Sequence, residues 1–233
     1  MTSRGDIQAS RDGNPTPTPD IGGSLTVVGA NHRTAPLNLR EKLAIPPDKL
    51  VEALRSLRQA HPAGELMILS TCNRTELYVA CPDGFAPCMT RLLDWLADRC
   101  GVDPVSLETM IYRHAGAAAV RHAFRVVSSL DSMVVGESEI VGQTRHALVA
   151  ARDVGVIGPA LQGIFGRALA VARQVRADTA LADHRASVGT VAVDCAAQIL
   201  AGLTGRTVLL IGAGKIGRVV ARRLAAFPDG RVL

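Results

Sequence analysis

The most constraining feature of the sequence is a polar cluster that separates two apolar runs between Glu65 and Tyr78. Leu66 to Leu69 form a run of the length expected for a short buried strand, and a second strand is predicted to begin near Leu77. Between them lie hydroxyl, thiol, amide and guanidinium side chains. The cluster is therefore predicted to lie at the end of a strand, where its side chains are accessible.

Cys72 is the candidate nucleophile within this cluster. A cysteine is reactive when its thiolate is accessible and stabilised by a nearby cation, and Arg74 lies two residues further along the chain. The alternative is a structural role, because unpaired cysteines are among the most buried residue types. The polar neighbours Thr71 and Asn73 favour catalysis, since a cysteine that only fills space gains nothing from them.

The nonapeptide Ser-Thr-Cys-Asn-Arg-Thr-Glu-Leu-Tyr, residues 70–78, resembles a motif of the glutamyl-tRNA reductases. Further stretches match that family in the same order: Gly-Ala-Asn-His-Arg-Thr-Ala-Pro at 29–36, Leu-Arg-Glu-Lys-Leu at 39–43, Leu-Asp-Ser-Met-Val-Val-Gly-Glu-Ser-Glu-Ile-Val-Gly-Gln at 130–143, and Gly-Ala-Gly-Lys-Ile-Gly at 212–217. The resemblance implies NADPH-dependent reduction of glutamyl-tRNA(Glu) to glutamate-1-semialdehyde through a thioester on Cys72, the first step of tetrapyrrole biosynthesis.

The resemblance also implies roles for individual residues. His122, on a predicted helix, is expected to assist Cys72 as a base, because imidazole titrates near neutral pH. The alternative is a structural histidine that is either solvated or satisfied by hydrogen bonds within the protein. Arg74 is the expected partner of the substrate carboxylate, since a guanidinium can make two parallel charged hydrogen bonds. The residues expected to bind the substrate are Thr71, Asn73, Arg74, Ser132, Glu137, Glu139 and Gln143.

Two positions depart from the family pattern. Glu139 stands where relatives usually carry glutamine, which adds a negative charge beside a pocket for an anionic side chain. Ser129 stands where they usually carry glycine, and we expect this change to matter less. Without the resemblance, the segment from Ser128 to Arg145 would be interpreted as an exposed loop followed by a helix capped by Ser138.

The predicted elements before residue 116 follow the order of a ferredoxin-like domain. Strands are expected over 25–28 and on both sides of Cys72, helices over 46–60 and 87–100, and either a strand or a helix start over 110–112. Helices would cover one face of this antiparallel sheet. Long amphipathic helices, predicted over 117–130, 158–179 and 187–201, follow.

The apolar run and the glycines of residues 207–217 form a pattern that predicts the start of a Rossmann-type NADP-binding domain. A buried parallel strand would lead into a turn where Gly212, Gly214 and Gly217 let a pyrophosphate approach a helix N-terminus. Because the sequence stops at Leu233, within the expected second strand, the NADPH site is expected to be incomplete. The alternative function is therefore a truncated fragment or paralogue that binds or slowly deacylates glutamyl-tRNA. An unrelated dehydrogenase would leave the Cys72 motif unexplained.

The predicted fold class is α+β followed by α/β. We expect a disordered arm over 1–23, a catalytic domain over 24–155, connecting helices over 156–205 and a partial NADP-binding domain over 206–233. The resemblance implies glutamate-1-semialdehyde aminomutase as a partner. It also implies a homodimer in the family, although the dimerisation domain is expected to be absent here.

Composition adds weaker constraints. The net charge of +5 and pI of about 9.3 are compatible with an RNA partner but also with many other proteins. No signal sequence or membrane-spanning apolar segment is recognised, so a cytoplasmic protein is expected. The five cysteines are Cys72, Cys81, Cys88, Cys100 and Cys195. They form no CxxC pair and leave an odd one over, so no disulfide framework is expected. No metal site is expected either, because the histidines lack the spacing of metal ligands.

Overall fold

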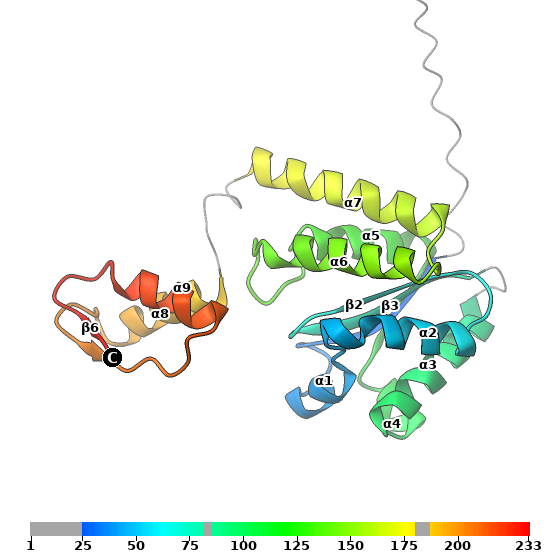
Figure 1. Cartoon of the computed structure of the whole chain (residues 1–233), viewed down its shortest axis with the longest axis horizontal. Coiled ribbons are helices and arrows are strands. Elements are labelled where there is room, and N and C mark those ends of the chain that lie inside the picture. Colours follow the sequence, from blue (N-terminus) through cyan, green and yellow to red (C-terminus); the bar gives the residue numbers. More distant parts are fainter. Residues whose placement is uncertain (1–24, 82–84, 180–186) are drawn as a thin grey trace, which may run out of the picture.

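The structure is a computed structural model that describes residues 25–81, 85–179 and 187–233. The arm predicted over 1–23 lies outside these residues. Two hydrophobic cores are present, a large one between Leu25 and Ala172 and a small one that contains Val193, Leu203 and Leu224. They belong to the two parts of the chain on either side of residues 180–186 (Figure 1).

Within the described residues, the larger part contains a four-stranded antiparallel sheet in the order β2-β3-β1-β4. This order confirms the predicted ferredoxin-like pattern. In the register, Val27 lies opposite Tyr78, and Ile68 lies opposite Leu77. The strands are β1 (Leu25–Asn31), β2 (Glu65–Ser70), β3 (Arg74–Ala80) and β4 (Tyr112–Ala115).

Strand β3 begins at Arg74, and the prediction that it begins near Leu77 is wrong. Every residue of β3 is buried, including its polar first half. Charged residues enter a buried strand only when they are paired, and Arg74 and Glu76 form an ion pair there. The hydrophobic pattern could not show this pairing, so it placed these residues in the loop.

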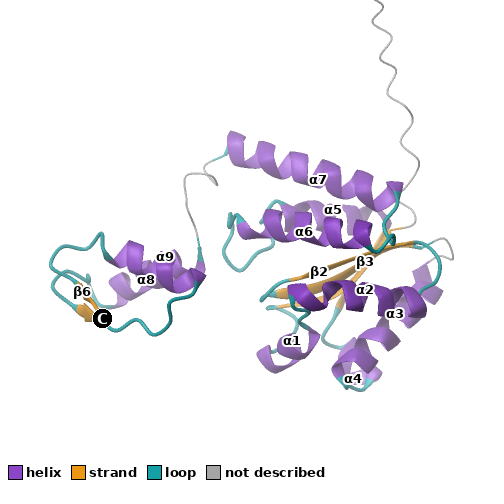
Figure 2. Cartoon of the chain, viewed as in Figure 1, coloured by secondary structure: helices purple, strands orange, loops and turns teal. Residues whose placement is uncertain are grey.

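Helices cover both faces of this sheet, whereas the sequence predicted one covered face (Figure 2). Helices α2 and α3 pack on one face, and α5, α6 and α7 pack on the other (Figure 1). The second layer explains why β1 and β3 are buried along their whole length. The helices are α1 (Leu37–Leu43), a 3-10 turn (Pro47–Lys49), α2 (Leu50–Ala60), α3 (Phe85–Cys100), α4 (Pro104–Glu108), α5 (Gly116–Val127), α6 (Glu139–Asp153) and α7 (Pro159–Asp178).

The smaller part contains α8 (Val188–Ile199), β5 (Thr207–Val208), α9 (Lys215–Leu224) and β6 (Arg231–Val232). Strand β5 pairs in parallel with β6, as a Rossmann-type start requires. The expected buried strand through residue 211 is wrong, because β5 ends at Val208 and Leu209 and Ile211 are exposed. A parallel strand is buried only when neighbouring strands and helices cover it, and within the described part β5 has one partner strand.

The two helices predicted as connectors pack in different parts of the molecule. Helix α7 packs against α5 and the sheet, whereas α8 packs against α9. The domain boundaries at 155 and 205 stay a prediction. In the described part of the chain, no helix is long and apolar enough to cross a membrane.

A disulfide joins Cys81 to Cys88, seven residues apart. The sequence did not predict this pair, because the expectation rested on CxxC spacing and on the odd number of cysteines. Strand β3 ends just before Cys81 and α3 contains Cys88, so the fold brings the two sulfurs together. Cys72, Cys100 and Cys195 are free cysteines.

The N-terminus of α7 is capped by a side chain from β2. The Glu65 carboxylate accepts hydrogen bonds from the backbone N–H groups of Ala160 and Leu161, at 2.9 and 2.7 Å. These N–H groups have no partner within the helix, and a carboxylate also interacts favourably with the helix dipole. A Cβ at Gly158 would lie 2.5 Å from Glu65 Oε1, so glycine leaves room for this cap.

We predict that Glu65→Ala lowers the free energy of unfolding by about 1–2 kcal/mol, because two helix N–H groups lose their acceptor. Urea unfolding followed by the fluorescence of Trp95, the single tryptophan, would measure this change in the larger part. Glu52→Ala is the matched control, because Glu52 is exposed and pairs only with Lys49. Equal stability of the two variants would contradict the capping role.

Candidate functional site

Cys72 lies on the short loop between β2 and β3 and is exposed. Thr71 shapes this loop, since its hydroxyl accepts hydrogen bonds from the backbone N–H groups of Asn73 and Arg74, both at 3.1 Å. The backbone N–H of Thr71 also donates to the Arg74 carbonyl at 2.8 Å. The loop therefore presents the thiol at the end of the sheet, as the sequence predicted.

A cavity of about 1390 Å³ opens beside the thiol. It is lined by five of the predicted site residues: Thr71, Cys72, Glu137, Glu139 and Gln143. Lys215 of α9 also lines it, and its Nζ lies 2.8 Å from Glu139 Oε1. The fold thus brings the strand-end cluster of residues 70–74 next to the segment that begins α6, although more than 60 residues separate them in sequence.

The surroundings of Cys72 raise the pKa of its thiol. Partial burial is the largest cause, and the carboxylates of Glu137 and Glu139 add to it. Arg40 opposes the shift through its positive charge, and its Nη1 donates a hydrogen bond to the Cys72 carbonyl at 3.2 Å. Arg40 is the cation whose charge most clearly opposes the rise of the thiol pKa. A stabilising effect of Arg74 on the thiolate stays a prediction.

Arg74 points into the protein rather than into the cavity. Its Nη1 donates to Glu76 Oε1 at 2.6 Å, and its Nη2 donates to Asp131 Oδ2 at 3.1 Å and to the Asp131 carbonyl. The guanidinium is nearly fully buried. Its predicted role as the carboxylate partner of the substrate stays a prediction. Asn73 and Ser132 likewise do not line the cavity.

Glu76 is the centre of a buried polar network. Its carboxylate accepts hydrogen bonds from Tyr78 Oη at 2.6 Å, from His122 Nε2 at 2.8 Å and from Tyr112 Oη, in addition to Arg74. Burial alone would raise the pKa of Glu76, but the hydrogen bond from His122 and the charge of Arg74 outweigh burial and lower this pKa from 4.5 to about 2. Glu76 is therefore a carboxylate at neutral pH.

His122 belongs to this network. Its ring also packs against the rings of His114 and Tyr112, with centroid distances of 4.5 and 5.2 Å. Among the contacts of the described residues, no hydrogen bond joins His122 to Cys72. The predicted role of His122 as the base stays a prediction. Of the alternative, a solvated histidine is wrong because the imidazole is mostly buried, whereas a structural histidine with its hydrogen bonding satisfied agrees with the contact to Glu76.

The segment between α5 and α6 is partly buried rather than an exposed loop. Ser129 has a φ of 60°, a left-handed conformation that glycine adopts without strain, which explains why a glycine is expected at this position. Its hydroxyl donates to Ser132 Oγ at 3.1 Å, and Ser132 in turn bonds to Glu137. Ser138 precedes α6 but makes no side-chain cap.

The glycine-rich turn has the predicted local geometry. Gly212 has a φ of 110°, and a Cβ at Gly217 would lie 2.2 Å from the Gly212 carbonyl oxygen. Gly214 immediately precedes α9. These glycines permit the tight turn that a pyrophosphate site requires, so the residues fit the predicted cofactor loop.

Sequence reasoning missed Arg40, Glu76 and Asp131. Glu76 and Asp131 both lie inside motifs that carry the family resemblance. The available signal for Glu76 was a carboxylate directly before the apolar run that begins at Leu77, since such a carboxylate must be paired when it is buried. Arg40 also lies in a stretch that carries the resemblance, residues 39–43, but nothing in the sequence pairs it with the Cys72 loop, because the contact joins segments 32 residues apart.

We predict that Glu76→Gln lowers the free energy of unfolding at neutral pH by about 3–5 kcal/mol, because it removes the more deeply buried of the two carboxylates that pair with Arg74. Since the folded-state pKa of Glu76 is depressed, its contribution is present above pH 4.5 and is lost as pH falls toward about 2. The variant should therefore lose less stability than the wild type between these pH values. Urea unfolding at several pH values measures this pH dependence, with Glu52→Gln as the control. If the free energy of unfolding of Glu76→Gln and of the wild type changed equally with pH, the proposed ionisation of Glu76 in the network would be contradicted.

We predict that Glu139→Gln speeds alkylation of Cys72 by iodoacetamide at neutral pH roughly two-fold, because it removes one charge that raises the thiol pKa. Mass spectrometry in a Cys195→Ser background would follow the reaction at Cys72. Glu52→Gln again serves as the control. An unchanged or slower rate would show that Glu139 does not act on the thiol.

Comparison with known proteins agrees with these features. Residues 28–179 match the family model described as glutamyl-tRNAGlu reductase, N-terminal domain. The matched residues end one position after the last residue of α7, Asp178. The glutamyl-tRNA reductase of Marinobacter nauticus is 44% identical over 202 residues, which are 87% of this chain and 46% of that protein. The glutamyl-tRNA reductase of Alkalilimnicola ehrlichii is 47% identical over 201 residues, which are 86% of this chain and 44% of that protein.

The solved structure of glutamyl-tRNA reductase from Methanopyrus kandleri superimposes with a TM-score of 0.63 and 32% identity, covering 90% of this chain and 48% of that one. The chain thus spans about half the length of the relatives it matches. The family match covers most of the described residues and includes most of the ferredoxin-like sheet and the Cys72 loop. This chain therefore belongs to the glutamyl-tRNA reductase family.

Proposed function

We propose that the chain supplies the substrate-binding, cysteine-bearing part of an NADPH-dependent glutamyl-tRNA reductase. The observation that carries this proposal is the exposed thiol of Cys72 at the edge of a large cavity. Two relatives whose matches cover most of this chain are named glutamyl-tRNA reductase. The position of the thiol supports covalent capture of an acyl group, because an acyl carbonyl can reach it from the cavity.

In the proposed reaction, the Cys72 thiolate attacks the ester carbonyl carbon of glutamyl-tRNA. The C–O bond to the tRNA breaks, the terminal ribose hydroxyl takes a proton, and a thioester remains on Cys72. NADPH bound at the glycine-rich turn would supply the hydride that reduces the acyl group to glutamate-1-semialdehyde. The thiolate is the leaving group of that second step, so Cys72 is regenerated.

The thiol needs a base, because its surroundings raise its pKa. His122 is the proposed base. The Glu76 carboxylate accepts a hydrogen bond from Nε2 at 2.8 Å, which fixes the proton of the neutral imidazole on Nε2 and leaves the lone pair on Nδ1. Proton transfer from the thiol would therefore use Nδ1, directly or through a water molecule.

The charges around the cavity suggest how the glutamyl group is oriented. Glu137 and Glu139 line the cavity and suit the α-ammonium group of the substrate. Arg74 is proposed to bind the carboxylate, with the substrate displacing Asp131 rather than Glu76. Asp131 is 8% exposed whereas Glu76 is fully buried, so Asp131 is the partner that a ligand can replace. Thr71, Ser132 and Gln143 would complete the site, and glutamate-1-semialdehyde aminomutase is proposed to receive the product.

We predict that incubation with glutamyl-tRNA gives a covalent glutamyl adduct on Cys72 and that Cys72→Ser abolishes it. Intact-mass measurement followed by peptide mapping, with NADPH withheld, would detect and place the adduct. Slow release of glutamate is the expected side reaction, because water can hydrolyse a thioester.

Cys195→Ser is the matched control, since Cys195 is also an exposed free cysteine. It should leave the adduct unchanged. An adduct that persists in Cys72→Ser, or one that maps to Cys195, would contradict the proposed nucleophile.

A further inference from the structure

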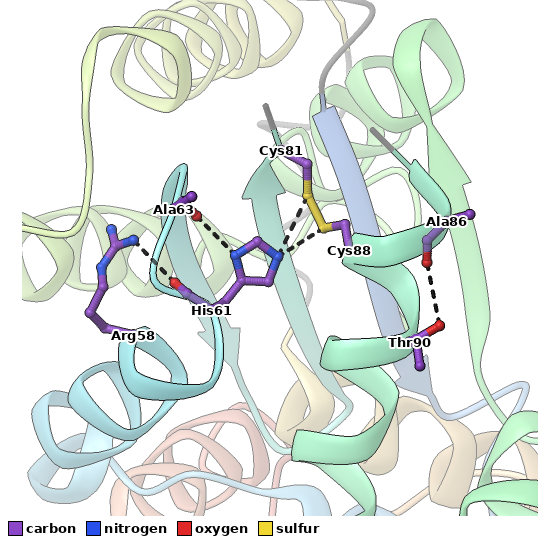
Figure 3. The surroundings of a disulfide bond; sticks show 7 residues. All are labelled: Arg58, His61, Ala63, Cys81, Ala86, Cys88 and Thr90. Atoms are coloured by element: carbon purple, nitrogen blue, oxygen red, sulfur yellow. Dashed lines mark hydrogen bonds between the residues drawn. A yellow bond between two sulfur atoms is a disulfide. The ribbon is translucent and has the colours of Figure 1, made fainter. Parts of the chain in front are cut away.

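A second cluster of chemically reactive side chains lies away from the Cys72 cavity. His61 follows α2, Cys81 follows β3, and Cys88 lies in the first half of α3 (Figure 3). All three are buried, with exposed fractions of 1%, 3% and 0%. Their ligand atoms lie within 4.8 Å of one another. Two cysteines and a histidine form a typical ligand set for thiophilic metal ions.

The histidine is oriented as a metal ligand. Its Nδ1 lies 2.9 Å from the Ala63 carbonyl, which can only accept a hydrogen bond, so Nδ1 carries the proton of the neutral ring. Its Nε2 therefore directs a lone pair toward the sulfurs, at 3.2 Å from Cys88 Sγ and 3.8 Å from Cys81 Sγ (Figure 3). A carbonyl that holds the second ring nitrogen is the usual support of a zinc-binding histidine.

The distances suit a tetrahedral ion. With Zn–N and Zn–S bonds of about 2.0 and 2.3 Å, a tetrahedral zinc ion holds nitrogen and sulfur about 3.6 Å apart. The two observed nitrogen to sulfur distances, 3.2 and 3.8 Å, lie on either side of this value. The same geometry holds the two sulfurs about 3.8 Å apart, so they separate once the disulfide is reduced, whereas His61 Nε2 already faces them.

The turn that carries His61 is held in place by Arg58. The guanidinium donates hydrogen bonds to the carbonyls of His61, Pro62 and Gly64, at 3.2, 2.9 and 2.9 Å, and to the carbonyl of Val156 at 3.2 Å. The last contact ties the turn to the segment between α6 and α7. A ligand fixed in this way needs little ordering when it binds an ion.

The sulfurs are joined as a disulfide in this structure, so the cluster can bind an ion only after reduction. Two molecules of a cellular monothiol supply the two electrons and two protons that convert the disulfide into two thiols, and they leave as a disulfide themselves. Zn²⁺ then replaces the two thiol protons, which are released to solvent.

We propose that reduced Cys81 and Cys88, together with His61, bind one Zn²⁺ ion and that the disulfide is the metal-free form of the same site. Two thiolates balance the charge of Zn²⁺, which suits a fully buried site, whereas Cu⁺ would leave a net negative charge there. Among the described residues three ligands are present, and a tetrahedral ion takes a fourth. The site links β3, α3 and the end of α2, so zinc and the disulfide are alternative cross-links of the same elements.

The test uses the full chain in a Cys72→Ser/Cys195→Ser background, which removes the exposed thiols. We expect the reduced chain to hold one zinc per molecule after gel filtration, measured by mass spectrometry of the metal. Cys81→Ser and Cys88→Ser should each weaken zinc binding at least about 100-fold in competition with a chromophoric chelator. Cys100→Ser is the matched control, because Cys100 is buried but lies outside the cluster, and it should leave the affinity unchanged.

A second measurement needs no variant within the cluster. Co²⁺ added to the reduced chain should give a thiolate-to-metal charge-transfer band, and the chain with the disulfide intact should give none. The proposal is overturned if the reduced chain binds no zinc, if the oxidised chain binds it equally well, or if Cys81→Ser leaves the affinity unchanged. Binding of Cu⁺ without binding of Zn²⁺ would overturn the assignment to zinc.

Discussion

The buried ion pair between Arg74 and Glu76 is the interaction on which the arrangement of the site depends. Both side chains lie in β3 between two helical layers, where an unpaired charge would be unfavourable by several kcal/mol. The pair is tolerated because the other donors of the network, Tyr78, Tyr112 and His122, satisfy the remaining acceptor capacity of Glu76. A partly satisfied network would destabilise the same core that it now fixes.

The network connects elements that are far apart in the sequence. Tyr112 comes from β4, His122 from α5 and Asp131 from the segment before α6. Each is held against β3, whose first residue lies two positions after Cys72. The register that buries Glu76 therefore also leaves Cys72 at the end of the sheet. Core stability and the placement of the thiol have the same structural origin.

The electrostatics of the cavity differ from those of an isolated reactive cysteine. Acidic side chains and partial burial keep the thiol of Cys72 protonated, and Arg40 offsets this effect only in part. A thiol of this kind reacts when a base removes its proton or when the charge of a ligand offsets the acids. Glu137 and Glu139 thus affect both the thiol and any cationic group that enters the cavity.

The polar loop that presents Cys72, the order of the main strands and helices and the glycine turn could all be predicted from the sequence. These features depend on local patterns: the apolar run before Ser70, the polar cluster around Cys72, and glycines between a strand and a helix. Only the tertiary structure decided the partners of Arg74, the direction of the thiol pKa shift and the meeting of His61 with Cys81 and Cys88. Such outcomes require side chains from distant segments to share one buried environment, and the free energy of burying a charge or a thiol depends on that environment rather than on neighbours in sequence.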